Sequence, residues 1–357
     1  MTKRVLLFEY ATGGGAWEDV SLLAGDSPFL QEGAMMVRAL LADLSSLADV
    51  EVVVLWDARL PSSWLGPLTT GTQLEFVASV AQWRVAIETA AQTCTETLLV
   101  APECGGVLER LTDRAAQAGL KLACPQGECV RLASDKHATC EWLLRAGVRC
   151  PAGVRLGSGD QLPESFSYPA VLKPVDGAGA AGVRTIKRAS SLARCPQSGV
   201  AWRLENFVAG RAASVLLLRY DSQGTNRVVA LPAAWQRLES GETWSYLGGE
   251  TPIDASYAER AVRLALQTAE ALPSWRGLLG VDLVLGADAS GADDWVIEVN
   301  PRVTTSYVGV RQILRGNALS LLFGVESDES VVQMRPGAST VRWTTDQFHF
   351  AGGSALQ

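Results

Sequence analysis

A short apolar segment that carries two polar residues near position 298 constrains the fold most. Residues 295–299 form a β-rich run of the kind found in strands. Pro301 ends that run, because proline has no N–H to donate to a neighbouring strand. Glu298 and Asn300 are two residues apart, so their side chains point to the same face of the predicted sheet. A carboxylate and an amide oxygen on one face suit Mg²⁺ better than a transition metal.

A second acidic strand precedes this one. Residues 280–285 carry a single acid, Asp282, in an apolar run, and the polar segment 286–294 joins the two runs as a hairpin loop would. If the two runs pair antiparallel, Asp282 reaches the same cation as Glu298 and Asn300. The alternative is that three polar residues merely lie on a half-exposed sheet.

Length and charge exclude several classes of protein. A chain of 357 residues is long enough for two or three domains. Its net charge is −7, without a long Lys/Arg block, which argues against a nucleic-acid partner. No apolar run approaches the roughly 20 residues of a membrane span, and Glu9 follows the start too soon for a signal peptide. We therefore expect a cytoplasmic protein without a membrane partner.

The cysteines do not indicate a disulfide framework or a zinc site. There are seven of them, an odd number, and no CxxC pair occurs. Reduced, buried or half-buried thiols are the simpler interpretation.

The first third of the chain alternates strands and helices. Strands are predicted at residues 5–10, 50–55 and 97–101, and helices at 29–44, 74–91 and 107–118. This alternation is typical of a parallel sheet with right-handed crossovers. Residues 1–122 are therefore predicted to be a small, doubly wound α/β domain.

Strands outnumber helices in the prediction for the rest of the chain. Helices are predicted from 133 to 145, over 257–272 and near 309–315 and 317–323. Further strands are predicted at 168–174, 201–208, 214–219, 228–235 and 339–344, with a turn at 243–249.

A glycine-rich loop follows a strand that ends in a lysine. Lys173 lies directly before the loop 176–183, which contains Gly177, Gly179 and Gly182. Small residues let backbone amides approach an anion, and the lysine can place its ammonium on the same phosphates. A plain β-hairpin is the alternative.

Other candidate ligand groups are weaker when taken singly. Lys136, near a predicted helix start capped by Ser134 or Asp135, reads by itself as a surface lysine. The loop with Gly13 and Gly14 lacks GxGxxG spacing and is either a ligand loop or a tight turn. Glu32 is predicted to open a helix whose N-terminal amides could hold an anion, or it is an ordinary N-terminal acid.

Hydroxyl groups and a guanidinium follow the metal strand. Arg302, Thr304, Thr305 and Ser306 lie directly after Asn300. Such groups beside Mg²⁺ form a place for an acidic substrate.

The order of these parts resembles the ATP-grasp superfamily over roughly residues 123–323. The first domain resembles the usual N-terminal companion of that fold. The resemblance implies a two-lobed ATP-grasp domain over 123–325, with its lobes meeting near 200–208, and a tail over 326–357. Residues 8–15, 246–249 and 298–307 are more closely similar to the tyramine–glutamate ligases of methanofuran biosynthesis and their bacterial relatives in one-carbon metabolism.

The resemblance implies roles for single residues. Lys136 and Lys173 would hold the ATP phosphates, with Gly177 to Gly182 folded over them. The adenine would be read by Glu205 and the backbone of Asn206, Phe207 and Val208. The cation, Mg²⁺ or in its place Mn²⁺, would be held by Asp282, Glu298 and Asn300.

Arg302 would face the transferred phosphoryl group or the substrate carboxylate, and with Lys173 it is the candidate catalytic residue. Ala212 departs from the pattern, since many members carry there a glutamate that binds the ribose hydroxyls. How the ribose is held is therefore left open.

The implied reaction is ATP-dependent amide formation through an acyl phosphate. Glutamate is the expected acid and tyramine or tyrosine the expected amine, with Gly13, Gly14, Glu32 and residues 304–306 around them. Two alternatives are an ATP-grasp ligase for another amino acid or peptide, and a nucleotide-binding regulatory module without turnover. The expected partners are small molecules, and a homodimer is left open.

Overall fold

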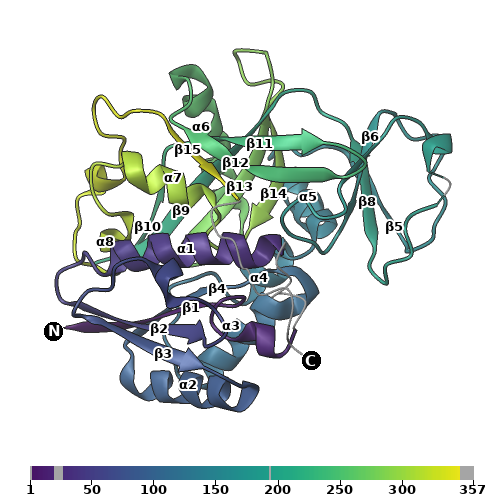
Figure 1. The fold of residues 1–357 in the computed structure, drawn as a ribbon. Helices are drawn as coiled ribbons and strands as arrows, with labels where there is room; N and C mark the ends of the chain where they lie inside the picture. Colours follow the sequence, from purple (N-terminus) through teal and green to yellow (C-terminus); the bar gives the residue numbers. More distant parts are fainter. Residues whose placement is uncertain (1, 20–26, 193, 346–357) are drawn as a thin grey trace.

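The computed structural model describes residues 2–19, 27–192 and 194–345 and contains three sheets (Figure 1). One sheet belongs to the first domain, and a second forms a small projecting lobe. The third sheet is the largest and contains most of the remaining strands. Figure 1 shows the lobe with β5, β6 and β8 standing away from the other two parts. A mixed α/β architecture is therefore confirmed.

The first sheet has four parallel strands in the order β3-β2-β1-β4. Its strands are β1 (Lys3–Glu9), β2 (Val50–Asp57), β3 (Thr72–Val77) and β4 (Glu96–Val100). Its helices are α1 (Pro28–Leu44), α2 (Val80–Thr93) and α3 (Val107–Gln117), with short 3-10 helices η1 (Gly15–Trp17), η3 (Ser62–Leu65) and η4 (Cys104–Gly106). The doubly wound domain is thus as predicted.

One predicted helix in this domain is wrong in its first part. Residues 74–77 belong to β3, which pairs with β2, and α2 begins only at Val80. Ser79 separates the two elements, because its hydroxyl accepts a hydrogen bond from the Gln82 amide and caps the helix. The apolar residues on both sides of Ser79 belong to different elements.

The small lobe is an antiparallel sheet in the order β5-β8-β6-β7. Its strands are β5 (Gly153–Leu156), β6 (Ala170–Pro174), β7 (Arg184–Ile186) and β8 (Trp202–Asn206); α4 (Glu128–Ala133) and α5 (Lys136–Arg145) precede them, and η5 (Ala189–Ser191) follows β7. The glycine-rich loop joins β6 to β7, so it is the connection of a β-hairpin. The cap of α5 is Asp135, whose carboxylate accepts from the Ala138 amide.

The largest sheet runs β14-β13-β9-β11-β12-β15, with β10 paired to β9. Its strands are β9 (Arg211–Ser222), β10 (Thr225–Ala230), β11 (Ala234–Ser240), β12 (Trp244–Thr251), β13 (Gly277–Leu285), β14 (Trp295–Asn300) and β15 (Val341–Thr344). The accompanying helices are α6 (Ala255–Ala271), α7 (Ser306–Val310), α8 (Ala318–Leu322), η6 (Arg311–Ile313) and η7 (Glu329–Val332).

Strand β9 is buried on both faces, which explains its unbroken apolar sequence. Val215 and Leu217 belong to the core that packs against α6. Leu216 and Leu218 belong to the core shared with the first domain. Successive side chains of a strand point to opposite faces, so one strand contributes to both cores.

The predicted turn at 243–249 is wrong, because these residues form most of β12. Gly248 and Gly249 are there for close packing: a Cβ on Gly248 would lie 2.0 Å from the Trp343 carbonyl oxygen, and one on Gly249 would lie 2.4 Å from the Trp343 ring. The predicted strand at 228–235 is likewise two elements, β10 and β11.

The tail does not stand apart from the sheet. Strand β15 pairs antiparallel with β12 at the edge of the largest sheet. The last part of the predicted tail, 346–357, lies outside the described residues.

The first domain is fixed to the rest of the chain by buried polar contacts. Asp43 of α1 accepts hydrogen bonds from the Tyr307 hydroxyl at 2.5 Å and from Arg311 Nε at 2.8 Å. Arg276 donates to Glu96 of β4 at 2.6 Å. Figure 1 shows α1 lying between the parallel sheet and the largest sheet. Within the described ranges, no helix combines the length and the apolar character needed to cross a membrane.

We predict that Gly309→Ala destabilises the protein by loosening the tail strand. A Cβ on Gly309 would lie 2.1 Å from the Trp343 ring, so the ring or α7 must move. Overpacking of this kind costs about 1–3 kcal/mol. Urea unfolding measures the loss. Gly71→Ala is the matched control, since its Cβ would meet nothing nearer than 3.7 Å. Equal stability of the two variants would contradict the prediction.

Candidate active site

A cavity of about 420 Å³ lies where the small lobe, the largest sheet and α1 meet. Its size is in the range of small-molecule sites. Every metal residue proposed from the sequence lines it, as do Lys173, Arg302 and Glu32. The predicted lining residues found there are Glu32, Lys173, Gly179, Glu205, Asn206, Phe207, Val208, Asp282, Glu298, Asn300, Arg302, Thr304, Thr305 and Ser306.

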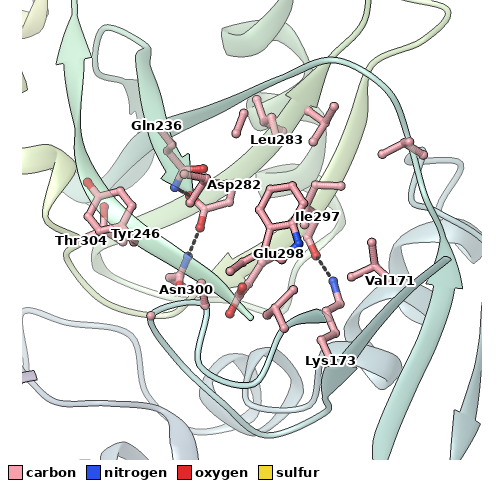
Figure 2. Close-up of a pocket in the computed structure, with 18 of the residues that line it drawn as sticks. Val171, Lys173, Gln236, Tyr246, Asp282, Leu283, Ile297, Glu298, Asn300 and Thr304 are labelled. Atoms are coloured by element: carbon pink, nitrogen blue, oxygen red, sulfur yellow. Dashed lines mark hydrogen bonds between the residues drawn. The ribbon is translucent and has the colours of Figure 1, made fainter. Parts of the chain in front are cut away.

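Lys173 is buried and fixed at the junction of the two sheets. Its ammonium lies 2.7 Å from a Glu205 carboxylate oxygen and donates to the Ile297 carbonyl at 3.1 Å (Figure 2). Arg203 donates from Nε to the other oxygen of Glu205 at 2.7 Å. Lys173 thus joins β6 to β14, and both oxygens of Glu205 already have a cationic partner.

Lys136 is buried as well, which excludes the surface-lysine interpretation. Its ammonium lies 2.6 Å from Glu298 Oε1 and also donates to the Gly177 carbonyl of the glycine-rich loop. Burial lowers the pKa of Lys136, but Glu298 and Glu103 outweigh burial and leave that pKa above its ordinary value. One cation therefore connects α5, the loop and the predicted metal strand.

The predicted pairing of the two acidic strands is confirmed, with Asp282 of β13 opposite Glu298 of β14. Figure 2 shows Asp282 between two amides. Its oxygens accept from Gln236 Nε2 and Asn300 Nδ2, each at 3.0 Å. Burial first, and then the charge of Glu298, raise the pKa of Asp282 to about 6.

These oxygen donors fit a hard cation. Asp282 and Glu298 are two acids whose charges repel, and a cation between them would relieve that repulsion. Across the described ranges, no cluster of three His, Cys, Asp or Glu residues could hold a metal, so a zinc-type centre is not indicated there. Carboxylate and amide oxygens are what Mg²⁺ prefers.

Arg302 is held by an acid that the sequence did not single out. Its Nε donates to Glu103 Oε2 at 2.6 Å, and both residues are buried. Burial raises the pKa of Glu103, but Arg302 and Lys136 outweigh it and leave that pKa below its ordinary value. Glu103 lies just beyond the carboxyl end of β4. Ligand sites of parallel sheets lie at that edge, so its position could have marked it as a candidate site residue.

Glu32 lies one turn into α1 and not at its start. The helix begins at Pro28, so the prediction that its N-terminal amides lie at Glu32 is wrong. The carboxylate is half-buried and lines the cavity. Burial first, and then the charge of Glu103, raise its pKa to about 7.

Four predicted glycines do not line this cavity. Gly13 and Gly14 form a buried turn: a Cβ on Gly13 would overlap Phe8, and one on Gly14 would lie 2.9 Å from Val77. Gly182 packs beside Pro174 and Trp202, and Gly177 offers its carbonyl to Lys136.

Four polar lining residues were not among the predicted site residues. Arg211 comes from β9, Gln236 from β11, and Trp244 and Tyr246 from β12. The Tyr246 hydroxyl accepts from Thr305 Oγ1 at 3.0 Å. Figure 2 shows Tyr246 and Thr304 on the side of the cavity opposite Lys173. Tyr246 lies in the segment 246–249 that entered the family resemblance, whereas no motif marks Gln236 or Trp244.

Two family models match the chain. Residues 133–306 match the ATP-grasp domain, and residues 50–130 match the pre ATP-grasp 3 domain. Among curated proteins, no sequence matches.

Solved structures with a similar fold include the following three. An ATP-grasp superfamily protein from Archaeoglobus fulgidus is 20% identical, with a TM-score of 0.63, over 90% of this chain and 88% of that one. The carboxyaminoimidazole ribonucleotide synthase of Aspergillus clavatus, complexed with ATP, is 16% identical, with a TM-score of 0.62 and coverage of 94% and 80%. The L-amino acid ligase of Bacillus licheniformis is 16% identical, with a TM-score of 0.59 and coverage of 93% and 77%. These likenesses show the fold.

We predict that Glu32→Gln stabilises the ligand-free protein above neutral pH. The folded protein keeps a proton on Glu32 up to about pH 7, whereas the unfolded chain releases it near the ordinary value of 4.5. Wild-type stability therefore falls as pH rises through that window. The variant should melt about 2–4 °C higher at about pH 8.

The pH dependence of the melting temperature checks this prediction. The gain should shrink as pH falls and vanish below about pH 4.5, where the acid is neutral in both states. Glu51→Gln, at an exposed position of β2, is the matched control and should show no such gain. A gain that does not depend on pH would contradict the assignment.

Proposed function

The chain is a member of the ATP-grasp superfamily, and we propose that it is an ADP-forming ligase that joins a carboxylate to an amine. One observation supports this most. A single cavity gathers two strands with oxygen ligands, a buried lysine at a β-strand end, a nucleotide-sized space and an arginine. A binding module without turnover would need the nucleotide contacts but not the second, substrate-facing half around Arg302.

The half of the cavity near the small lobe would hold ATP. Lys173 would act as a point charge on phosphate oxygens, and Gly179 lies in the lining beside it. The amides of Asn206 and Phe207 already donate to the carbonyls of Ala152 and Pro169. The backbone of Val208 is then the better candidate to read the adenine edge.

Asp282, Glu298 and Asn300 would hold Mg²⁺, with Mn²⁺ as a substitute. A bound cation supplies charge neutralisation on the phosphate oxygens. Lys136 would then exchange Glu298 for the phosphates, beside the glycine-rich loop whose Gly177 carbonyl already accepts from it.

Positioning and charge neutralisation are the main demands of such a reaction. The substrate carboxylate attacks the γ-phosphorus and ADP leaves, which gives an acyl phosphate. An amine then attacks the acyl carbon and phosphate leaves. Neither step requires a covalent enzyme intermediate. This agrees with a cavity that offers lysines, an arginine and carboxylates.

Glutamate is the proposed acid, and tyramine or tyrosine the proposed amine, as in methanofuran-type cofactor synthesis. The hydroxyls of Thr304, Thr305 and Ser306 lie with Arg302 in the lining, which suits a substrate carboxylate. The fold of the L-amino acid ligase supports a second candidate, a ligase for another amino acid.

Hydroxylamine trapping tests the proposal. Wild-type protein with MgATP and L-glutamate should release ADP and form the glutamyl hydroxamate, and EDTA should abolish both. A panel of the other amino acids identifies a different acid. Absence of hydroxamate with every amino acid would overturn the ligase proposal.

We predict that Glu298→Gln lowers hydroxamate formation by about 100-fold or more, because a neutral amide is a poorer Mg²⁺ ligand and no longer balances Lys136. Initial rates at saturating Mg²⁺ measure the loss, with a melting curve of the same sample. Glu242→Gln, whose side chain is 90% exposed, is the control. Wild-type rates in a folded Glu298→Gln protein would exclude the metal assignment.

We predict that Arg302→Lys raises the KM for the acid and lowers kcat by about 10- to 100-fold, while ATP binding stays nearly unchanged. Lysine keeps the charge but loses the planar fork that holds Glu103 and faces the cavity. Calorimetry measures the affinity for ATP. Hydroxylamine-trapping rates at increasing concentrations of the acid give its KM and kcat. Arg342→Lys, at an exposed site, is the control. Loss of ATP affinity with an unchanged KM for the acid would assign Arg302 to the nucleotide.

A further inference from the structure

The cavity leads to a much smaller pocket at the junction with the first domain. This second pocket has a volume of about 20 Å³. Glu32 and Arg302 line both spaces, so they stand at the boundary between them. The other walls come from the carboxyl ends of β1 and β4 and from α1, namely Glu9, Tyr10, Ala11, Phe29, Met36, Val100, Ala101 and Pro102.

The polar groups at this boundary carry an excess of negative charge. Glu9, Glu32 and Glu103 gather around Arg302, and Lys136 acts on Glu103 as well. Arg302 is already engaged by Glu103 at 2.6 Å, and Lys136 by Glu298 at 2.6 Å. The acids therefore outnumber the cations, and the site favours a further cation.

Glu9 is satisfied within its own loop. Its carboxylate accepts from the Ala11 amide at 3.1 Å, the Thr12 amide at 2.8 Å and the Thr12 hydroxyl at 2.8 Å. Gly33 makes room for it, because a Cβ there would lie 2.5 Å from Glu9 Oε2. The absence of a side chain at position 33 thus allows the two acids Glu9 and Glu32 to lie close together.

Glu32 is different, because it makes no hydrogen bond or ion pair with any residue that the structure describes. A half-buried carboxylate without a partner is costly. Such a cost is retained where the group meets a ligand. A zinc-type site is not indicated here, since no cluster of three His, Cys, Asp or Glu residues suited to a metal occurs in the described ranges.

We propose that Glu32 receives the ammonium group of the amine substrate at the mouth of the small pocket and takes its proton before attack. This assignment rests on the proposed ligase function and names the substrate class for this part of the cavity. A volume of about 20 Å³ holds little more than one ammonium group. The body of the amine remains in the large cavity, whose lining near Glu32 includes the Tyr246 ring and suits a primary amine with an apolar or aromatic group.

The proton balance of the step is simple. The Glu32 carboxylate takes one proton from R–NH₃⁺ and becomes a carboxylic acid. The neutral nitrogen forms a C–N bond with the acyl phosphate, and the C–O bond to phosphate breaks with its electron pair on phosphate. The second proton leaves the nitrogen with the departing phosphate, so no further reactant is needed.

The surroundings of Glu32 suit this proton transfer. The groups that face it are Glu9 of β1, Tyr10 in the loop after it, Glu103 beyond β4, Tyr246 of β12 and Arg302. Burial raises the pKa of Glu32 to about 7, against the opposing effect of Arg302. A base with a pKa near 7 can accept and release a proton near neutrality.

Comparison of two nucleophiles separates this proposal from the ligase proposal. Hydroxylamine is largely neutral near pH 7 and needs no base, whereas a primary alkylamine is cationic. Wild-type, Glu32→Gln, Glu32→Asp and the control Glu51→Gln would be assayed with MgATP and L-glutamate. The nucleophile would be hydroxylamine, or whichever of tyramine, L-tyrosine and phenethylamine gives the most amide with wild-type protein.

The expected result is a split between the two nucleophiles. Glu32→Gln should lose about 100-fold in kcat/KM for the amine and keep the hydroxamate rate within about twofold. The wild-type amine rate should rise with pH to a plateau above about pH 7, and that inflection should disappear in Glu32→Gln. Glu32→Asp should recover part of the amine rate, and Glu51→Gln should behave as wild type.

Three results would overturn the assignment. A near-normal amide rate in Glu32→Gln would show that the Glu32 carboxylate does not take part in the attack of the amine. An equal fall of the amide and hydroxamate rates would show that Glu32 acts before the amine does, in the formation of the acyl phosphate from the acid and ATP. Hydroxamate without amide from any of the three amines would show that no such ammonium is accepted. A wild-type protein without hydroxamate would instead refute the ligase function itself.

Discussion

Three buried cations, each held by an acid from another element, determine the geometry of the cavity. Lys136 of α5 pairs with Glu298 of β14, Lys173 of β6 with Glu205 of β8, and Arg302 with Glu103 of the first domain. A buried charge is costly unless it is paired and hydrogen-bonded. The pairs of Lys136 and Arg302, together with the bond from Lys173 to the Ile297 carbonyl, therefore fix α5, the lobe, the largest sheet and the first domain relative to one another.

Such pairing also keeps the ligand-free cavity close to electrical balance around the lysines. In the proposed ligase, the phosphates of ATP would replace Glu298 as the partner of Lys136, and the bound cation would replace Lys136 as the partner of Glu298. The charged groups are oriented before the ligand arrives, which lowers the reorganisation needed during reaction. The excess of acid around Arg302 is the exception, and it lies where the cavity meets the first domain.

Local patterns predicted the elements, but not the partners of the charged residues. The two-residue spacing of Glu298 and Asn300 in an apolar run was enough to predict a strand with both side chains on one face. The burial of Lys136 could not be predicted, because it depends on Gly177 and Glu298, which are distant in sequence. Glu103 was missed for the same reason. Strand β3 was read as helix because short apolar runs fit both periods, and only pairing with β2 decides between them.

Strand β15 has a consequence for the behaviour of the chain in solution. It covers the outer edge of β12, and its Trp343 packs on Gly249 and Gly309. An uncovered edge presents unpaired N–H and C=O groups to which a strand of another molecule can add. Detachment of this short strand would therefore create both an open edge and an apolar groove, so self-association at high concentration should depend on how firmly the tail strand is held.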